Sequence, residues 1–511
     1  MRNVQLKSVL TKDIPSSIVV FLVALPLCMG VAIASDASVV SGLIAGIVGG
    51  IVVGLISNSH TSVSGPAAGL TVIVAGAIAT LQSFEMFLAA VVIAGIIQLA
   101  LGLFKLGILA QYVPNAVIKG MLAAIGLILI LKQIPHAVGY DANFEGDFSF
   151  WQKDNHNTFS ELYYMLDFLN FGAVIITLIS LALLILWDKP FFKKLPLVST
   201  IPGALVVVIL GVVLNLFFQS SIPDFYLSKE HLVNMPNFES PVDFFTTLTH
   251  PDFSQLFSNL NVWIVAGQIA LVASLESLLS IEATDKLDPE NRITSPNREL
   301  IAQGSGNILA GLIGGIPVTA VIVRSSANIN SGNHSKFSAV LHGTWLLLAV
   351  LFLGKYMNYV PYASLAAVLL MVGYKLTKPS LFLEEKAKGW SSLIPFVVTI
   401  VAILFTDLLV GVLIGIVTGV IFIMRSNSQN AYSVIREPNR WTFLFNKDIV
   451  FTNKATLKKD LLNIKPGTQI VFDTSKIDFM DADVKELLNE FIESTHHSDL
   501  EVKVIGDKLK V

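Results

Sequence analysis

Two short apolar segments, one in each half of the chain, are interrupted by glycine and proline where an ordinary membrane span would be continuous. They read SGPAAGLT at residues 64–71 and GGIPVTAV at residues 314–321. A helix that begins at mid-depth in a membrane exposes unpaired backbone N–H groups and the positive end of its dipole, which an anion can satisfy and hydrocarbon cannot. Paired interruptions therefore indicate an anion site, although Gly and Pro also occur at ordinary kinks of membrane helices.

The interruptions supply candidate donors to an anion. We expect these to be the backbone N–H groups at Ala67, Ala68, Gly69, Val318, Thr319 and Ala320, with the hydroxyl groups of Thr71 and Thr319 in addition.

Glu276 lies inside an apolar segment, where a charge is costly and therefore indicates function. Ser280 follows four residues later, so the carboxylate and the hydroxyl share a helix face and together can bind a cation. In its protonated form, which an apolar setting favours, Glu276 would carry a proton instead. The alternative is a structural hydrogen bond to a neighbouring helix.

Arg324 follows the second interruption and remains charged in any setting, so it requires an anion, a carboxylate or a carbonyl as partner. Attraction of the substrate and a structural ion pair with Glu276 are both consistent with its position. A third interpretation is that Arg324 marks the cytoplasmic end of a short helix. Glu282 lies at a predicted membrane edge, where a solvated helix end is the better interpretation.

The composition excludes several classes of protein. Of the 511 residues, 53% are hydrophobic and only 14% are charged, which is typical of a polytopic membrane protein. The net charge of −3 and the scattered basic residues predict no nucleic-acid partner. One cysteine, Cys28, and scattered histidines predict no metal cluster, and no Walker A motif is present. No nucleophile and base pair is visible, so we expect no enzymatic activity.

The apolar pattern predicts fourteen membrane segments in two sets of seven. Their approximate bounds are 14–34, 38–56, 66–80, 86–104, 114–131, 168–187, 199–218, 261–282, 299–315, 319–330, 337–353, 361–375, 391–406 and 408–424. The third and tenth are short. Because seven is odd, the second set enters the membrane from the opposite side, which predicts an inverted repeat.

The loop charges agree with this topology. With a cytoplasmic N-terminus, residues 1–13, most loop lysines and arginines fall inside, and the outer loops hold only Lys132, Lys153, Lys229 and Lys355. A cytoplasmic C-terminus follows. The transmembrane domain is predicted at residues 14–425. Gly42, Gly46, Gly50 and Gly54 recur every four residues, which predicts close helix packing within the chain or with a second subunit.

The composition becomes that of a soluble domain after Arg425. Strand-like runs at residues 441–445, 469–473 and 501–505 flank an amphipathic helix at residues 482–493. We therefore expect a small cytoplasmic α/β domain at residues 430–511.

The chain resembles the SulP family of sulfate permeases over essentially its full length. The motifs that carry the resemblance are LESLL at 275–279, NRELIAQGSGN at 297–307, GGIP at 314–317, RSSAN at 324–328, ALP at 24–26 and SGP at 64–66. It implies a core domain and a gate domain that move in an elevator mechanism, usually within a homodimer. It also implies that residues 430–511 form a STAS domain, whose cytoplasmic partner it leaves open.

The resemblance also places an anion between the facing ends of the third and tenth helices, near Pro26. In the similar cyanobacterial bicarbonate branch, the acidic residue of the sodium site falls at Glu276 and its hydroxyl partner at Ser280. That branch has Asp where Glu276 stands, which leaves Na⁺ and H⁺ open as the coupling ion. Many relatives have Ser where this chain has Val323. Asp481-Ala482-Asp483 stands where related STAS domains carry a phosphorylatable hydroxyl.

Together these features predict a secondary active transporter of an inorganic anion in the cell membrane. Sulfate and bicarbonate are the expected substrates, moved by cation symport or anion exchange. The alternatives are a C4-dicarboxylate or nucleobase transporter of the same fold, a passive anion channel, and a membrane scaffold that acts through its STAS domain.

Overall fold

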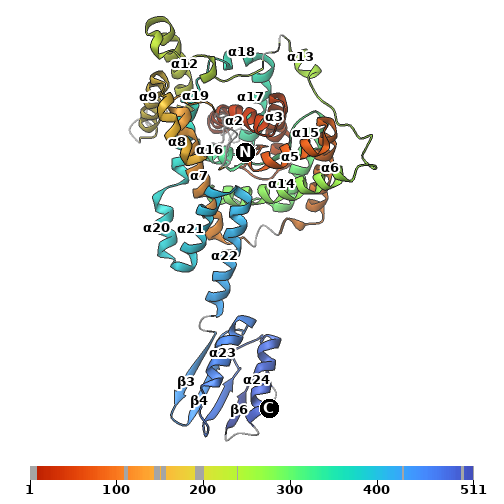
Figure 1. Ribbon diagram of the computed structural model, residues 1–511, viewed down its shortest axis with the longest axis vertical. Coiled ribbons are helices and arrows are strands. Elements are labelled where there is room, and N and C mark those ends of the chain that lie inside the picture. The colour runs from red at the N-terminus through yellow and green to blue at the C-terminus, as the bar shows by residue number, and fades with distance from the viewer. Residues whose placement is uncertain are drawn as a thin grey trace. The chain divides into compact units, whose positions relative to one another are not determined.

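The computed structural model describes residues 9–108, 113–142, 150, 157–189, 201–236, 238, 240–428, 431–495 and 500–509. The chain folds into two compact units. One comprises residues 1–387 and 396–415, and the other comprises residues 388–395 and 416–511 (Figure 1). The predicted boundary lies later, at residues 425–430. The sequence boundary follows the change in polarity, whereas the boundary between the compact units lies inside an apolar helix, α22 (Leu408–Ser428).

Helices lie over all seven predicted segments of the first half. Their bounds are η1 (Val9–Asp13), α2 (Ile14–Ala34), α3 (Val39–Val48), η2 (Gly49–Val53), α4 (Gly54–Ile56), η3 (Ala68–Leu70), α5 (Thr71–Leu81), α6 (Phe84–Leu103), α7 (Asn115–Ala137), α8 (Thr158–Tyr164), η5 (Met165–Phe168), α9 (Phe171–Trp187) and α12 (Gly203–Ser221).

Helices also lie over the seven predicted segments of the second half. After the short η6 (Pro223–Phe225), η7 (Lys229–His231) and α13 (Pro241–Thr246), they are α14 (Leu260–Leu287), α15 (Pro296–Leu312), α16 (Ile322–Asn330), α17 (Phe337–Leu348), η8 (Ala349–Leu353), α18 (Gly354–Met357), α19 (Tyr362–Leu376), α20 (Pro379–Ala387), α21 (Trp390–Phe405) and α22 (Leu408–Ser428).

The described part of the chain contains nine helices that are long and apolar enough to cross a membrane. The number becomes ten if the bent pair at residues 158–168 and 171–187, which meet at 117°, counts as one span. Two shorter apolar helices cover Ala68–Leu81 and Trp390–Phe405. The protein is therefore a polytopic helical membrane protein, as its composition predicts.

The helices of the first unit pack in two groups (Figure 1). In one group, α2 packs against α3, α16 and α17, and α6 packs against α14 and α15. In the other group, α19 packs against α7 and α9, and α9 packs against α12. The predicted glycine stripe belongs to the first group, because a Cβ at Gly42 would clash with Cys28 of α2 and one at Gly50 with Gly343 of α17. These glycines therefore pack within the chain.

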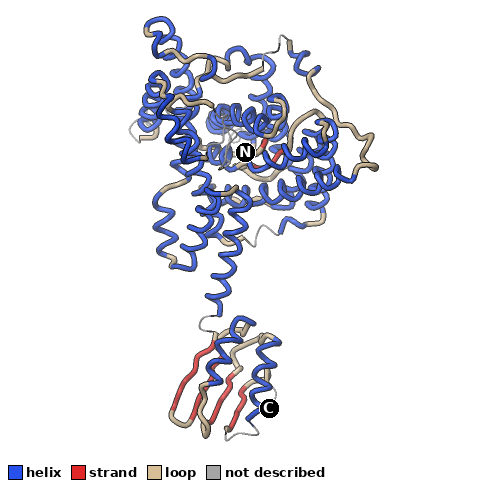
Figure 2. The backbone as a smooth tube through the Cα atoms, in the orientation of Figure 1, coloured by secondary structure: helices blue, strands red, loops and turns tan. Residues whose placement is uncertain are grey.

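The two interrupted segments meet as a two-stranded antiparallel sheet inside this unit (Figure 2). Strand β1 (Ser64–Pro66) pairs with β2 (Val318–Ala320), with Gly65 opposite Thr319 and Pro66 opposite Val318. All six residues are buried. Extended backbone inside a membrane domain is tolerated only where its polar groups find partners, and mutual pairing of the strands provides them.

The second unit contains a four-stranded sheet in the order β3-β4-β5-β6. Strands β3 (Tyr432–Glu437) and β4 (Arg440–Phe445) are antiparallel, whereas β5 (Gln469–Asp473) and β6 (Glu501–Ile505) continue the sheet in parallel. Helices α23 (Lys454–Leu462) and α24 (Ala482–Thr495) bury Leu457 and Leu488 in the same core as Phe443 and Phe472. The sequence patterns did not predict β3 or α23.

Candidate functional site: a cavity at two helix N-termini

The pairing of β1 with β2 brings two helix N-termini to one place. Helix η3 continues into α5 directly after β1, and α16 begins directly after β2. Neither η3, α5 nor α16 has a side-chain N-cap. The N–H groups at the starts of η3 and α16 therefore have no acceptor from an N-cap side chain, and the positive dipole ends of these helices lie near one another.

A cavity of about 240 Å³ lies at these helix starts. Its lining residues come from η3, α5, α14 and α16 and from α7 and the start of α22, so helices of both groups contribute to the cavity. Its lining consists of Ala67, Ala68, Gly69, Thr71, Val72, Ile73, Ile125, Ile128, Glu276, Ser280, Ala320, Val321, Ile322, Val323, Asp407, Leu408, Leu409 and Val410.

Seven of the eleven predicted site residues belong to this lining: Ala67, Ala68, Gly69, Thr71, Glu276, Ser280 and Ala320. The other four, Pro26, Val318, Thr319 and Arg324, are buried outside it. Pro26 lies in the interior of α2. The hydroxyl of Thr71 donates to the carbonyl oxygen of Ala68 at 2.8 Å, and that of Thr319 to the carbonyl oxygen of Ala320 at 3.3 Å.

The prediction that Val318 and Ala320 offer N–H groups to an anion is wrong for this conformation. The Val318 N–H donates to Asn307 Oδ1 at 2.6 Å, and the Ala320 N–H donates to Ser277 Oγ at 3.2 Å. Asn307 Nδ2 also donates to the Val318 carbonyl at 3.0 Å and to Gln98 Oε1 at 2.7 Å. Available donors in this half therefore lie further along, in the first turn of α16.

A second set of side chains holds β1. Gln303 Nε2 donates to Ser64 Oγ and to Glu299 Oε1, both at 2.8 Å. Ser57 Oγ donates to Glu299 Oε2 at 2.5 Å. Gln303 and Glu299 are fully buried, so their mutual hydrogen bonds offset part of the cost of removing them from water. The signal in the sequence was a polar face of α15, which carries one of the family-like motifs.

Arg324 is fully buried behind the strand pair rather than in the cavity wall. Its Nη2 donates to the Pro66 carbonyl at 3.4 Å, whereas Nε and Nη1 have no partner among the described residues. No ion pair with Glu276 occurs in the described part of the chain. The interpretation of Arg324 as the marker of a short helix's end is wrong, because Arg324 lies in the first turn of α16 and is fully buried.

Glu276 faces the cavity from α14. The residue is 9% exposed, and its Oε2 has no hydrogen-bond partner among the described residues. A Cβ on Gly69 would lie 2.9 Å from Glu276 Oε1. The carboxylate therefore lies directly against the start of η3 and α5, which we call the first half-helix, the second being α16. Ser280 lines the cavity one turn further along α14. Glu276 and Ser280 therefore line the same cavity.

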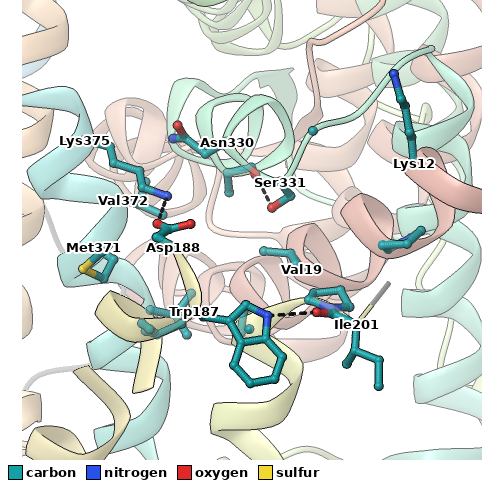
Figure 3. A pocket seen from close by; sticks show the side chains of 18 of the residues that line it. Lys12, Val19, Trp187, Asp188, Ile201, Asn330, Ser331, Met371, Val372 and Lys375 are labelled. Atoms are coloured by element: carbon teal, nitrogen blue, oxygen red, sulfur yellow. Dashed lines mark hydrogen bonds and ion pairs between the residues drawn. The ribbon is translucent and has the colours of Figure 1, made fainter. Parts of the chain in front are cut away.

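A separate cavity of about 380 Å³ shares only α16 with the first cavity among its lining helices (Figure 3). It lies between the starts of α2 and α12 and the ends of α9, α16 and α19. Lys375 Nζ pairs with Asp188 Oδ2 at 2.8 Å, and Trp187 Nε1 donates to the Ile201 carbonyl at 3.1 Å. In the topology that the loop charges predict, these helix ends would face the cytoplasm. Helices of both groups contribute to the lining of each cavity.

The family to which this chain belongs follows from its sequence. The model of the sulfate permease family matches residues 10–401. The chain belongs to the sulfate permease family. The putative sulfate transporter YvdB of Bacillus subtilis is 29% identical over 97% of this chain and 91% of its own length. The bicarbonate transporter BicA of Picosynechococcus is 26% identical over 71% of this chain and 61% of its own length.

Solved structures show the same fold. The transmembrane domain of a cyanobacterium bicarbonate transporter, BicA, matches with a TM-score of 0.54 and 22% identity, covering 80% of this chain and 96% of that one. The overall structure of SLC26A9 matches with a TM-score of 0.67 and 16% identity, covering 97% of this chain and 84% of that one. This sulfate permease family member is thus a polytopic helical membrane protein with the fold of known transporters.

Proposed function

We propose that the chain is a secondary active transporter of a small inorganic oxyanion, with sulfate and bicarbonate as the leading substrates. The observation that carries this proposal is the pairing of β1 with β2, which places two uncapped helix N-termini at one cavity. The anion would bind to first-turn N–H groups at Ala68 and Gly69 and at Ile322 and Val323.

The charges around the cavity support an anion site. Two helix N-termini replace part of the hydration that an anion loses on entering the protein. Arg324 lies behind the strand, one residue from cavity-lining Ala67, because it donates to the carbonyl of Pro66. Its unpaired charge adds a positive potential without direct contact with the anion.

The membrane potential requires a coupling ion. An inside-negative potential opposes uptake of an anion by roughly 2.3 kcal/mol per charge per 100 mV, so accumulation needs a symported cation or an exchanged anion. Glu276 and Ser280 form the proposed site for Na⁺ or H⁺, since the carboxylate lines the same cavity and has an unpartnered oxygen. The residues fit either ion.

The remaining family features complete the proposal. The fourteen helical segments would form a 7+7 inverted repeat, and the two helix groups would act as core and gate in an elevator movement of a homodimer. The sheet of the second unit fits a cytoplasmic STAS domain at residues 430–511. Both termini would face the cytoplasm, with the transporter in the cell membrane.

Uptake into proteoliposomes tests this function. Labelled sulfate and bicarbonate are offered separately, each with an imposed sodium gradient, a proton gradient or neither. We expect cation-driven accumulation of at least one anion. Uptake without accumulation would support a passive channel, and transport of neither anion would favour the dicarboxylate or nucleobase alternatives.

Glu276→Gln tests the coupling site separately. We expect this variant to lose cation-driven accumulation while it keeps the fold. The matched control is Glu282→Gln, because Glu282 lies on the same helix but pairs with Lys286 at 3.1 Å and is partly exposed. Unchanged accumulation in Glu276→Gln would remove Glu276 from the coupling site.

A further inference from the structure

The lining of the cavity includes a second carboxylate, which no pattern in the sequence indicated. Asp407 lies in the turn between α21 and α22, is exposed, and lines the cavity together with Leu408, Leu409 and Val410. Its Oδ1 accepts the Val410 N–H at 2.9 Å, so Asp407 caps the start of α22. The cap fixes a negative charge on a wall that is otherwise apolar.

Asp407 and Glu276 are the ionisable side chains of the described lining. Each half-helix N-terminus contributes about half an elementary positive charge, or about one charge for both. Ionised Asp407 cancels about that amount. If the coupling cation neutralises Glu276, the remaining charge is the one positive charge of the Arg324 guanidinium behind β1. This sum balances a monoanion and leaves a dianion with an uncompensated negative charge in a partly desolvated site.

We propose that Asp407 makes the cavity selective for a monovalent oxyanion, such as bicarbonate, over a dianion such as sulfate. This inference rests on the proposed anion site at the half-helix N-termini. Repulsion by Asp407 is proportional to the charge of the anion, so it penalises sulfate twice as strongly as bicarbonate at the same position. Asp407 is therefore a specificity-determining residue of the cavity lining.

The Asp407→Asn variant isolates this charge. Asn also accepts a backbone N–H at a helix N-cap, so the cap on α22 is retained while the charge is removed. Asp407→Glu keeps the charge. The matched control is Asp252→Asn, since Asp252 is exposed, accepts the Ser254 N–H at 2.8 Å through Oδ1 and lies outside the cavity lining.

Initial rates of sulfate and bicarbonate uptake are measured for all four proteins in proteoliposomes under the same cation gradient. We expect the wild type to prefer bicarbonate and Asp407→Asn to raise the ratio of sulfate to bicarbonate uptake about tenfold. Asp407→Glu and Asp252→Asn should keep the wild-type ratio.

A wild type that prefers sulfate, or an unchanged ratio in Asp407→Asn, overturns the inference and leaves the proposed function standing. If the wild type transports neither anion, both this inference and the proposed function are wrong. If Asp407→Asn does not fold, Asp407→Ser provides the same test, because Ser is also a neutral N-cap.

Discussion

Gly65 lies so close to Arg324 that a Cβ on Gly65 would overlap the guanidinium at Nη1. Strand β1 therefore passes directly over the guanidinium at a residue that has no side chain. The register of the strand pair, with Gly65 opposite Thr319, fixes this approach, and the hydrogen bond from Nη2 to the Pro66 carbonyl completes it. Glycine at residue 65 is thus required by a charged side chain from the other half of the chain.

Gly65→Ala should abolish transport, because the methyl group must displace either β1 or the buried guanidinium. Uptake and the apparent melting temperature of the purified protein measure the effect. Gly76→Ala is the control, since a Cβ there meets nothing within 4 Å and alanine stabilises a helix interior by roughly 0.5–1 kcal/mol relative to glycine. Normal uptake by Gly65→Ala would show that the strand can move away from Arg324.

Gly69→Ala should disturb the coupling ion more than the fold. The new methyl group would lie 2.9 Å from Glu276 Oε1, so the carboxylate must rotate away from the start of the half-helix. We expect the cation concentration for half-maximal uptake to rise several-fold, with little change in melting temperature. An unaltered cation dependence would contradict the placement of the coupling ion beside Gly69.

Asn307→Leu should destabilise the protein by about 3 kcal/mol or more. It leaves the N–H and C=O groups of Val318 and the Gln98 side chain without the partners they have at 2.6–3.0 Å, and each unsatisfied buried group costs roughly 1–3 kcal/mol. Thermal unfolding in detergent measures the loss. Ser305→Ala serves for comparison, because Ser305 Oγ bonds only the Ile301 carbonyl of its own helix. Equal melting temperatures for the two variants would argue against this role of Asn307.

A histidine and aspartate contact on the predicted outer face should make stability depend on pH. Asp141 Oδ2 lies 2.7 Å from His231 Nδ1, and Asp141 Oδ1 lies 2.6 Å from His136 Nδ1. The hydrogen bond to Asp141 raises the pKa of His231 above its ordinary 6.5, despite an opposing effect of burial. Burial raises the pKa of Asp141, but the hydrogen bonds to both histidines outweigh it and hold this pKa below the ordinary 3.8.

The raised His231 pKa stabilises the fold fully below pH 6.5, and this contribution is lost as the pH rises through the raised value. The lowered Asp141 pKa stabilises the fold above pH 3.8, and this contribution is lost as the pH falls through the lowered value. Wild type should therefore exceed His231→Gln in melting temperature most clearly between these limits. His250→Gln is the control, since its Nδ1 lies near only the Leu312 carbonyl. A difference independent of pH would contradict the ionic contact.

Much of the fold follows from local pattern. Long apolar runs must become helices in a membrane, because only helices satisfy every backbone group within the segment. The two Gly and Pro interruptions likewise indicate where helices restart. The sequence therefore predicts site residues near an interruption, such as Ala68 and Gly69, and it predicts Glu276 through its charge in an apolar run. All three line the cavity.

The sequence alone determined that this chain is a helical membrane protein with two broken segments, because hydrocarbon imposes the same backbone requirement on every residue of a span. Only the tertiary structure decided which N–H groups remain available and where Arg324 points. Partners such as Asn307 for Val318 lie on another element, and spacing along one helix does not specify contacts with another. The position of Asp407 in the cavity lining was likewise not predictable from local sequence, because a residue in a short turn acquires its neighbours only when distant helices pack around it.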